Sequence, residues 1–182
     1  AFIDSDECFP SSLVDEIRNI VLSDSEPSIY RIHRRFIYDG EVVECSVGYP
    51  SHQIRLFRIS RVRGFIKPIH EKVDYDASEI VGDLKSVQHV PFDITPAELK
   101  NKWHGYLELQ VSNSLKSSPH RIFNSILNIL KYFPVYTFRL SLCRVFNKNK
   151  KLPLNLELVW YWQHLESLKL NVISILRHKR KT

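Results

Sequence analysis

Residues 29–47 read IYRIHRRFIYDGEVVECSV and carry a β-strand signal. β-Branched and aromatic residues flank Asp39-Gly40, a dipeptide that favours a two-residue hairpin turn. The pattern therefore predicts two antiparallel strands joined at this dipeptide. The turn-forming tetrapeptide at residues 48–51 then separates the hairpin from the next element.

The basic segment that follows, residues 52–62, fits either a helix or a strand. Arg55, Arg58 and Arg61 recur every three residues, which would align their guanidinium groups on one helix face. Apolar and polar residues also alternate over 55–59, as in a strand. The preceding serine can cap a helix, so we expect the helix. Because a planar guanidinium can bind phosphate through two hydrogen bonds, such a face would suit phosphate groups.

The remaining patterns predict a mixture of helices and strands. A short amphipathic helix is expected over residues 13–21, and a longer one over 119–132 that Pro134 would end. Strands are expected at 106–112, 136–146 and 154–162, whereas 165–176 fits either type of element. The apolar stripe of the second helix is expected to face the core, and consists of Ile122, Phe123, Ile126, Leu127, Ile129 and Leu130.

Residues 69–100 are polar and rich in turn-forming residues, which predicts a long surface loop. Within it, Thr95-Pro96-Ala97-Glu98 has the pattern of a helix cap followed by a short helical turn. The expected fold class is α+β, a single domain with a mainly antiparallel sheet and two or three packed helices.

Charge divides the chain into an acidic arm and a basic body. Residues 1–28 hold seven acidic residues and one arginine, whereas residues 29–182 hold 25 basic residues against 13 acidic ones. A body this basic should attract polyanions such as nucleic acid or an anionic membrane face. We therefore predict an acidic N-terminal arm with a short helix at 1–28, and a basic globular α+β domain at 29–182.

Within the body the basic residues form clusters, which we expect to bind anions. The candidate anion-binding residues are Arg31, Arg34, Arg35, Arg55, Arg58, Arg61, Arg63, Lys67, Lys148, Lys150, Lys151, Arg177, Lys179, Arg180 and Lys181.

No motif of enzymatic chemistry occurs in the sequence. A Gly-rich phosphate loop and the HExxH, GxSxG and EF-hand patterns are missing, and the eight histidines never fall at metal-ligand spacing. We expect no catalytic residues, metal, cofactor or small-molecule substrate. The three cysteines, Cys8, Cys45 and Cys143, are far apart and odd in number, so we expect thiols in a reducing compartment. Neither a signal peptide nor a transmembrane helix is expected.

Two segments resemble the matrix proteins of rhabdoviruses. The first is RFIYDGEVVECS at residues 35–46, followed by a polar turn and the basic segment 52–62; the second is GYLELQVS at residues 105–112. They occur in the order in which that family has them. The Lys-rich N-terminal tail and the PPxY motif of many animal-virus members are absent from this sequence, which puts attachment through such a tail and recruitment of budding factors in doubt.

The resemblance implies a non-enzymatic structural protein of the virion, located between nucleocapsid and envelope and, in the host, in the cytoplasm or nucleus and at the inner membrane face. Its partners would be the nucleoprotein–RNA complex, anionic lipid headgroups and further copies of itself. In that family an N-terminal arm docks on a neighbouring copy. The residues that this implies for self-association are Asp4, Asp6, Glu7 and Phe9.

Two other functions remain open at the level of sequence. A nucleic-acid-binding module would need aromatic rings interleaved with bases, and Tyr30, Phe36 and Tyr38 lie close to three arginines in the sequence. A subunit of a larger complex would use the apolar stretch at residues 154–176 as its interface.

Overall fold

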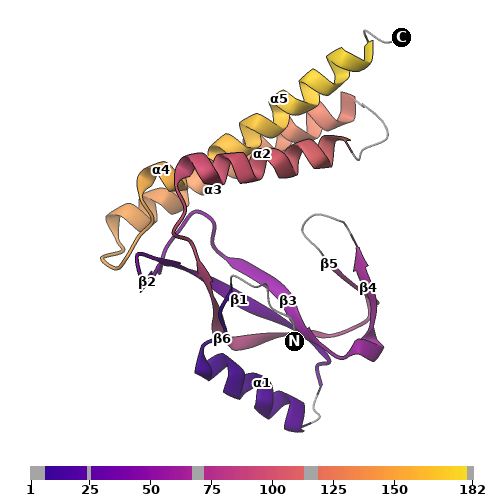
Figure 1. Ribbon diagram of the computed structural model, residues 1–182, viewed down its shortest axis with the longest axis vertical. Coiled ribbons are helices and arrows are strands. Elements are labelled where there is room, and N and C mark those ends of the chain that lie inside the picture. The colour runs from indigo at the N-terminus through magenta and orange to yellow at the C-terminus, as the bar shows by residue number, and fades with distance from the viewer. Residues whose placement is uncertain (1–6, 24–25, 67–71, 113–118, 180–182) are drawn as a thin grey trace. The chain divides into compact units, whose positions relative to one another are not determined.

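The chain divides into two compact units, which are described separately below. The structure is a computed structural model that describes residues 7–23, 26–66, 72–112 and 119–179. Unit 1, Ala1–Glu44 with Tyr49–Asp93, contains helix α1 and the β-strands, whereas unit 2, Cys45–Gly48 with Ile94–Thr182, contains the remaining helices (Figure 1). The predicted α+β class with mainly antiparallel strand pairing is confirmed.

The hairpin predicted within residues 29–47 is present in unit 1. Strand β1 spans Ile29–Tyr38 and pairs antiparallel with the short strand β2, Glu41–Val42. Asp39 and Gly40 both have positive φ angles, 57° and 73°, as a type I′ turn requires. The turn chemistry thus sets the strand register locally, with Tyr38 opposite Glu41.

The helix expected at residues 52–62 is wrong. This segment forms strand β3, Ser51–Phe57, then the short 3₁₀ helix η1, Ile59–Arg61, and the start of strand β4, Val62–Ile66. Pairing β3 with β1 satisfies its backbone and buries Leu56 in the core. The alternation at 55–59 does not mark one buried face, because Arg55 and Leu56 are both buried and Ile59 is exposed. The three arginines therefore lie on different elements and share no helix face.

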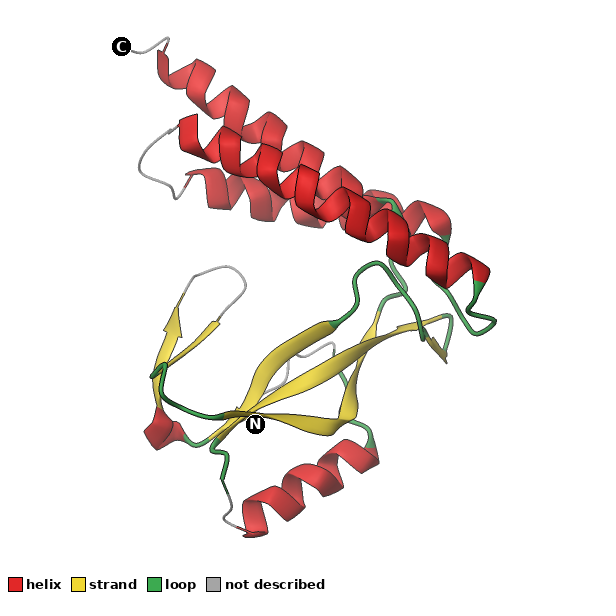
Figure 2. Ribbon diagram, turned by 180° about the vertical axis from the view of Figure 1, so that it is seen from behind, coloured by secondary structure: helices red, strands yellow, loops and turns green. Residues whose placement is uncertain are grey.

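The long loop expected at residues 69–100 is also wrong. It contains strand β5, Lys72–Tyr75, which pairs with β4, and strand β6, Val81–Pro91, which runs parallel to β1 (Figure 2). Strand β6 is hard to detect in the sequence because five of its eleven residues are polar, and only Leu84 and Gln88 are buried. Its strand geometry comes from pairing with β1.

Helix α1, Ser11–Ser23, covers one face of this sheet and confirms the helix predicted at 13–21. Leu13 packs in a cluster whose other buried members are Tyr30, Ile32, Leu56 and Leu84. The Glu16 carboxylate accepts hydrogen bonds from the backbone N–H groups of Lys85 and Ser86, at 2.8 and 2.7 Å. Burial alone would raise the pKa of Glu16, but these hydrogen bonds outweigh it and lower that pKa.

Unit 2 is built from helices, and the strands expected at 106–112, 136–146 and 154–162 are wrong. The helices are α2, Pro96–Ser112; α3, Pro119–Val145; α4, Leu154–Glu157; and α5, Val159–Lys179. Helix α5 packs against both α2 and α3 (Figure 1), so residues 165–176 are helical. Pro134 lies inside α3 and does not end it.

A spacing of four residues explains the error at 154–162. Leu156 and Trp160 are buried while Leu154 and Leu158 are exposed, so the two pairs lie on different faces of the α4–α5 segment. A strand pattern that repeats every two residues also repeats every four. The short segment 154–162 therefore does not distinguish strand alternation from helical spacing. The cap predicted at residues 95–98 is confirmed, because Thr95 Oγ1 accepts from Glu98 N–H and Glu98 accepts from Thr95 N–H.

The expectation of three free thiols is wrong. Cys45 and Cys143, which are 98 residues apart, form a disulfide with a Cα–Cα distance of 5.5 Å. Both residues belong to unit 2, and Cys8 is a free, exposed cysteine. Sequence spacing could not indicate this pair, because the fold of unit 2 is what brings the two cysteines together.

Candidate functional site

Two arginines predicted to bind external anions form ion pairs with Glu7 of the same chain. Arg34 Nη2 donates to Glu7 Oε1 at 2.7 Å, and Arg55 Nη2 donates to Glu7 Oε2 at 3.0 Å. Gln88 donates to the same carboxylate from β6. The side chains of Glu7 and Arg55 are only 3% and 5% exposed, so this cluster is a buried polar network in unit 1.

Other members of these clusters also have partners within unit 1. Arg31 donates to Asp83 at 2.7 Å, and the guanidinium of Arg35 lies 4.7 Å from the centre of the Tyr49 ring. Phe9 and Glu7 were predicted to contact a neighbouring copy, but both contact their own chain. Phe9 packs against the core beneath α1. Asp4, Asp6, Lys67, Arg180 and Lys181 lie outside the described residues.

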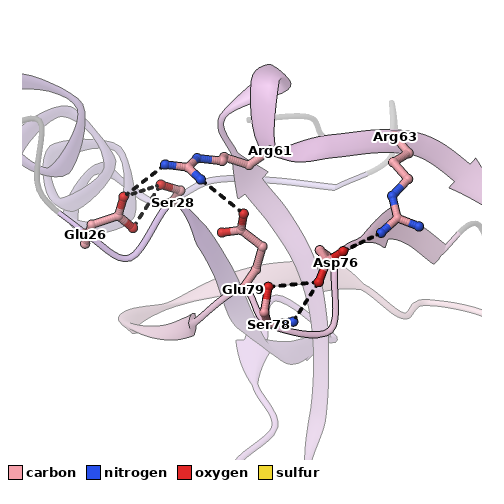
Figure 3. Close-up of polar contacts among 7 residues, drawn as sticks. All are labelled: Glu26, Ser28, Arg61, Arg63, Asp76, Ser78 and Glu79. Atoms are coloured by element: carbon pink, nitrogen blue, oxygen red, sulfur yellow. Dashed lines mark hydrogen bonds and ion pairs between the residues drawn. The ribbon is translucent and has the colours of Figure 1, made fainter.

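The arginines that follow β3 form ion pairs around the β4–β5 hairpin (Figure 3). Arg61 lies 3.4 Å from Glu79 and 3.9 Å from Glu26, and Arg63 lies 2.9 Å from Asp76. Hydrogen bonds from the backbone and side chain of Ser78, with the charge of Arg63, lower the pKa of Asp76. Because these pairs are exposed, each contributes little to stability, but they reduce the net positive charge of this surface.

The aromatic rings proposed for nucleic-acid stacking are largely inside unit 1. Tyr30 is 8% exposed and Phe36 is 7% exposed, and Phe36 stacks on Tyr49 and Phe92. A buried ring offers no face to a base. The structure therefore does not bring these aromatics and the neighbouring arginines together as a stacking surface.

A row of exposed apolar side chains lies on α3, where a core-facing stripe was predicted. Phe123, Ile126, Leu127 and Leu130 are between 41% and 66% exposed, so that part of the prediction is wrong. The exposed apolar residues continue beyond Pro134, after a step of five residues from Leu130 to Val135. The nine members of this stripe are eight residues of α3 and one directly after it: Phe123, Ile126, Leu127, Leu130, Val135, Phe138, Leu142 and Val145, followed by Phe146.

The opposite side of α3 packs against α5. Tyr132 stacks on His164 with ring centres 5.1 Å apart, and Tyr136 Oη lies 3.2 Å from His164 Nε2. Ser125 accepts a hydrogen bond from the buried Asn171 at 3.0 Å. On a helix Tyr132, Tyr136 and Ser125 lie about a third to half a turn from Leu127 and Leu130, so these two leucines point away from the contacts with His164 and Asn171.

The chain segment that carries the stripe contains basic residues and no acidic ones. No aspartate or glutamate occurs between Glu108 and Glu157, whereas eight lysines and arginines do. Lys131 is exposed beside the stripe, and Lys148 is exposed just after α3, as is Arg177 near the end of α5. Lys150 and Lys151 are half-buried, and Lys151 donates to the backbone carbonyl of Arg144. Lys179 ends α5, and its side chain is outside the described part.

Helix α3 thus combines an exposed apolar face, aromatic residues and a purely basic set of charges. This combination is typical of a helix that lies in the interface of an anionic membrane. The sequence predicted a helix in this region and the apolar residues of its stripe, but it did not predict that the stripe is exposed. The absence of acidic residues over 109–156 was the available signal, and it was overlooked.

The described part of the chain was also compared with the requirements of a metal site and of a membrane-spanning helix, and the whole chain with known proteins. Among the residues that the structure describes, no group of three or more His, Cys, Asp and Glu side chains could hold a metal ion. No helix in the described ranges has the length and hydropathy needed to span a bilayer. Compared with protein-family models, curated proteins and solved structures, the chain matches none.

Proposed function

We propose that this chain is a non-enzymatic, matrix-type structural protein that self-associates and links a nucleocapsid to the inner face of an anionic membrane. The observation that carries the membrane part is the exposed apolar stripe of α3 in a segment without acidic residues. In this proposal α3 lies parallel to the bilayer, with the stripe among the acyl chains and Lys131 and Lys148 among the headgroups.

The size of the stripe supports this proposal. Its nine exposed side chains together present on the order of 1,000 Å², more than the few hundred Å² usual for apolar patches of monomers. Burying half of that area in lipid would supply on the order of 10 kcal/mol before the cost of immobilising the protein. Each basic residue at an anionic surface adds about 1 kcal/mol.

Charge favours a membrane over a second copy of α3 as the occupant of this stripe. Two such helices packed together would bring lysines and arginines close to one another with no acidic residue between them. An anionic bilayer instead supplies phosphates and carboxylates around the stripe. Nucleocapsid binding remains part of the proposal and is supported by the net positive charge of the body. Self-association also remains part of it, on the family resemblance and not on an assigned surface.

Co-sedimentation with vesicles tests the membrane part. The chain should bind vesicles of phosphatidylcholine and phosphatidylserine, and bind pure phosphatidylcholine more weakly. The double variant Leu130→Ser, Phe138→Ser should bind at least about tenfold more weakly, because each buried side chain contributes about 1.5–3 kcal/mol. Its matched control is Leu22→Ser on α1, where the wild-type leucine is 76% exposed.

The charge contribution is tested with a second matched pair. Lys131→Gln should weaken binding to the anionic vesicles about fivefold, whereas Lys102→Gln on the exposed face of α2 should not. If the Leu130 and Phe138 double variant binds as tightly as the wild type, α3 is not the membrane surface. Binding of RNA without any binding of vesicles would favour the nucleic-acid module instead.

A further inference from the structure

Residues Cys45–Gly48 fold with unit 2, although Glu44 before them and Tyr49 after them belong to unit 1. We call this tetrapeptide the clamp segment. Its first residue is joined to α3 by the disulfide between Cys45 and Cys143. The clamp segment is thus held covalently in a unit that is otherwise formed by the chain from residue 94 onward.

The rest of the clamp segment is held by buried non-covalent contacts. Ser46 Oγ and the backbone N–H of Val47 both donate to Glu157 Oε2, at 3.1 and 3.0 Å. Arg139 on α3 donates to the carbonyl of Val47 at 3.4 Å. A Cβ at Gly48 would come within 2.7 Å of the Trp160 ring, so only glycine permits this close approach.

Glu157 and the clamp segment depend on each other. Glu157 is 1% exposed, and burial raises its pKa despite the hydrogen bonds from Val47 and Ser46. If the clamp segment left, the carboxylate would lose two hydrogen bonds in a buried place, at a cost of a few kcal/mol. The non-covalent contacts therefore favour docking, and the disulfide adds a covalent constraint that can be removed chemically.

We propose that Cys45–Cys143 is a reversible modification site for thiol–disulfide exchange with a dithiol reductant, and that its redox state controls whether the clamp segment stays docked in unit 2. The proposal does not depend on membrane binding. It differs from a purely structural disulfide because the bond is reduced in the folded protein.

The two sulfur atoms differ in access. Cys45 is half-buried, whereas Cys143 is 2% exposed, so an incoming thiolate attacks the Cys45 sulfur. The Cys45–Cys143 bond breaks as the mixed disulfide forms, and the Cys143 sulfur leaves as a thiolate.

The second thiolate of the reductant then attacks its own mixed-disulfide sulfur and releases Cys45 as a thiolate. The reductant is oxidised to a disulfide, and the protein disulfide is reduced by two electrons. The two protons of the dithiol remain available to protonate the two cysteines. The balance is therefore one protein disulfide and one dithiol giving two protein thiols and one oxidised reductant.

The redox state of the disulfide would change how many times the chain passes between the two units. With the clamp segment docked, the chain passes between the units at 44/45, 48/49 and 93/94. With the clamp segment released, only the passage at 93/94 joins them. Reduction would thus replace three chain passages between the units by one.

Reduction kinetics test the exchange step on the full chain carrying Cys8→Ser, purified without reductant. Dithiothreitol in native buffer should reduce the bond at a rate proportional to its concentration, because the thiolate attacks the folded protein. A rate independent of dithiothreitol concentration would mean that reduction waits for unfolding, and would overturn the proposal. Two titratable thiols before any reduction would overturn it as well.

Hydrogen exchange tests the release of the clamp segment. The Val47 amide should exchange at least about tenfold faster after reduction, and equally fast in the Cys45→Ser, Cys143→Ser variant. The Phe36 amide, which donates to Tyr49 in unit 1, is the internal control and should not change. Equal protection of Val47 in the oxidised and reduced proteins would overturn the proposal.

Discussion

At the scale of single residues, Glu7 shows how a predicted binding site became a structural one. Arg34 and Arg55 were expected to bind external anions, but a buried arginine needs a partner, and the chain supplies one from its own acidic segment. The carboxylate also ties the residues before α1 to strands β1, β3 and β6. The acidic arm therefore neutralises part of the basic body of the same chain.

We expect Glu7→Gln to lower the free energy of unfolding by about 3 kcal/mol, because it leaves two arginines without their carboxylate in a buried site. Urea denaturation followed by circular dichroism measures this. Asp15→Asn is the matched control, since Asp15 pairs with Arg18 on the exposed face of α1 and should cost less than about 0.5 kcal/mol. A loss below that value for Glu7→Gln would show that the network is not stabilising.

At the scale of elements, the packing of α3 on α5 depends on an imidazole among aromatic rings. His164 contacts Tyr132, Phe133 and Tyr136, and burial lowers its pKa below 6.5. The folded protein therefore favours the neutral ring, and the unfolded chain takes up a proton first on acidification. This contribution to stability is present above pH 6.5 and is lost as the pH falls through the lowered pKa.

We expect His164→Phe to reduce the pH dependence of stability between about pH 7.5 and about pH 5.5. The change should amount to a few tenths up to about 1 kcal/mol, because the imidazole is only half-buried. Glu157, whose pKa is raised, has the opposite pH dependence, so the difference between variant and wild type is the quantity to compare. The exposed His52→Gln in unit 1 is the control, and identical slopes for His164→Phe and wild type would contradict this assignment.

At the scale of the whole molecule, neither unit is a continuous piece of chain. Unit 2 needs the clamp segment at 45–48, which hydrogen-bonds Glu157 and carries the partner of Cys143. We therefore expect residues 94–182 produced alone to be less stable than unit 2 of the full chain by about 3 kcal/mol or more.

The expected loss can be measured by urea denaturation of the fragment and of the full chain, followed through the helical signal. In the fragment, Glu157→Leu should recover part of the loss, because a leucine needs no hydrogen-bond donors from the missing segment. In the full chain the same substitution leaves the donors of Ser46 and Val47 unpaired and should be destabilising. A fragment as stable as unit 2 of the full chain would show that the clamp segment contributes little.

The sequence by itself determined the features that depend on local chemistry and on charge. Asp39-Gly40 makes the hairpin turn because these residues tolerate positive φ, and Thr95 begins α2 because its hydroxyl and Glu98 cap the first turn. The α+β class was predicted in part from such local signals, although the strands expected at 106–112, 136–146 and 154–162 are helices. The acidic start and the basic remainder are likewise properties of composition alone.

Only the tertiary structure decided which faces are buried and which distant residues meet. The apolar stripe of α3 is exposed because α5 packs on another side of that helix. The sequence periodicity shows that an apolar face exists but not which face a neighbouring helix covers. Strand β6 is a strand because β1 supplies hydrogen bonds to a polar segment. Cys45 meets Cys143, and Glu7 meets Arg55, through contacts over 98 and 48 residues. Such contacts depend on the packing of the whole chain, and no local pattern encodes them.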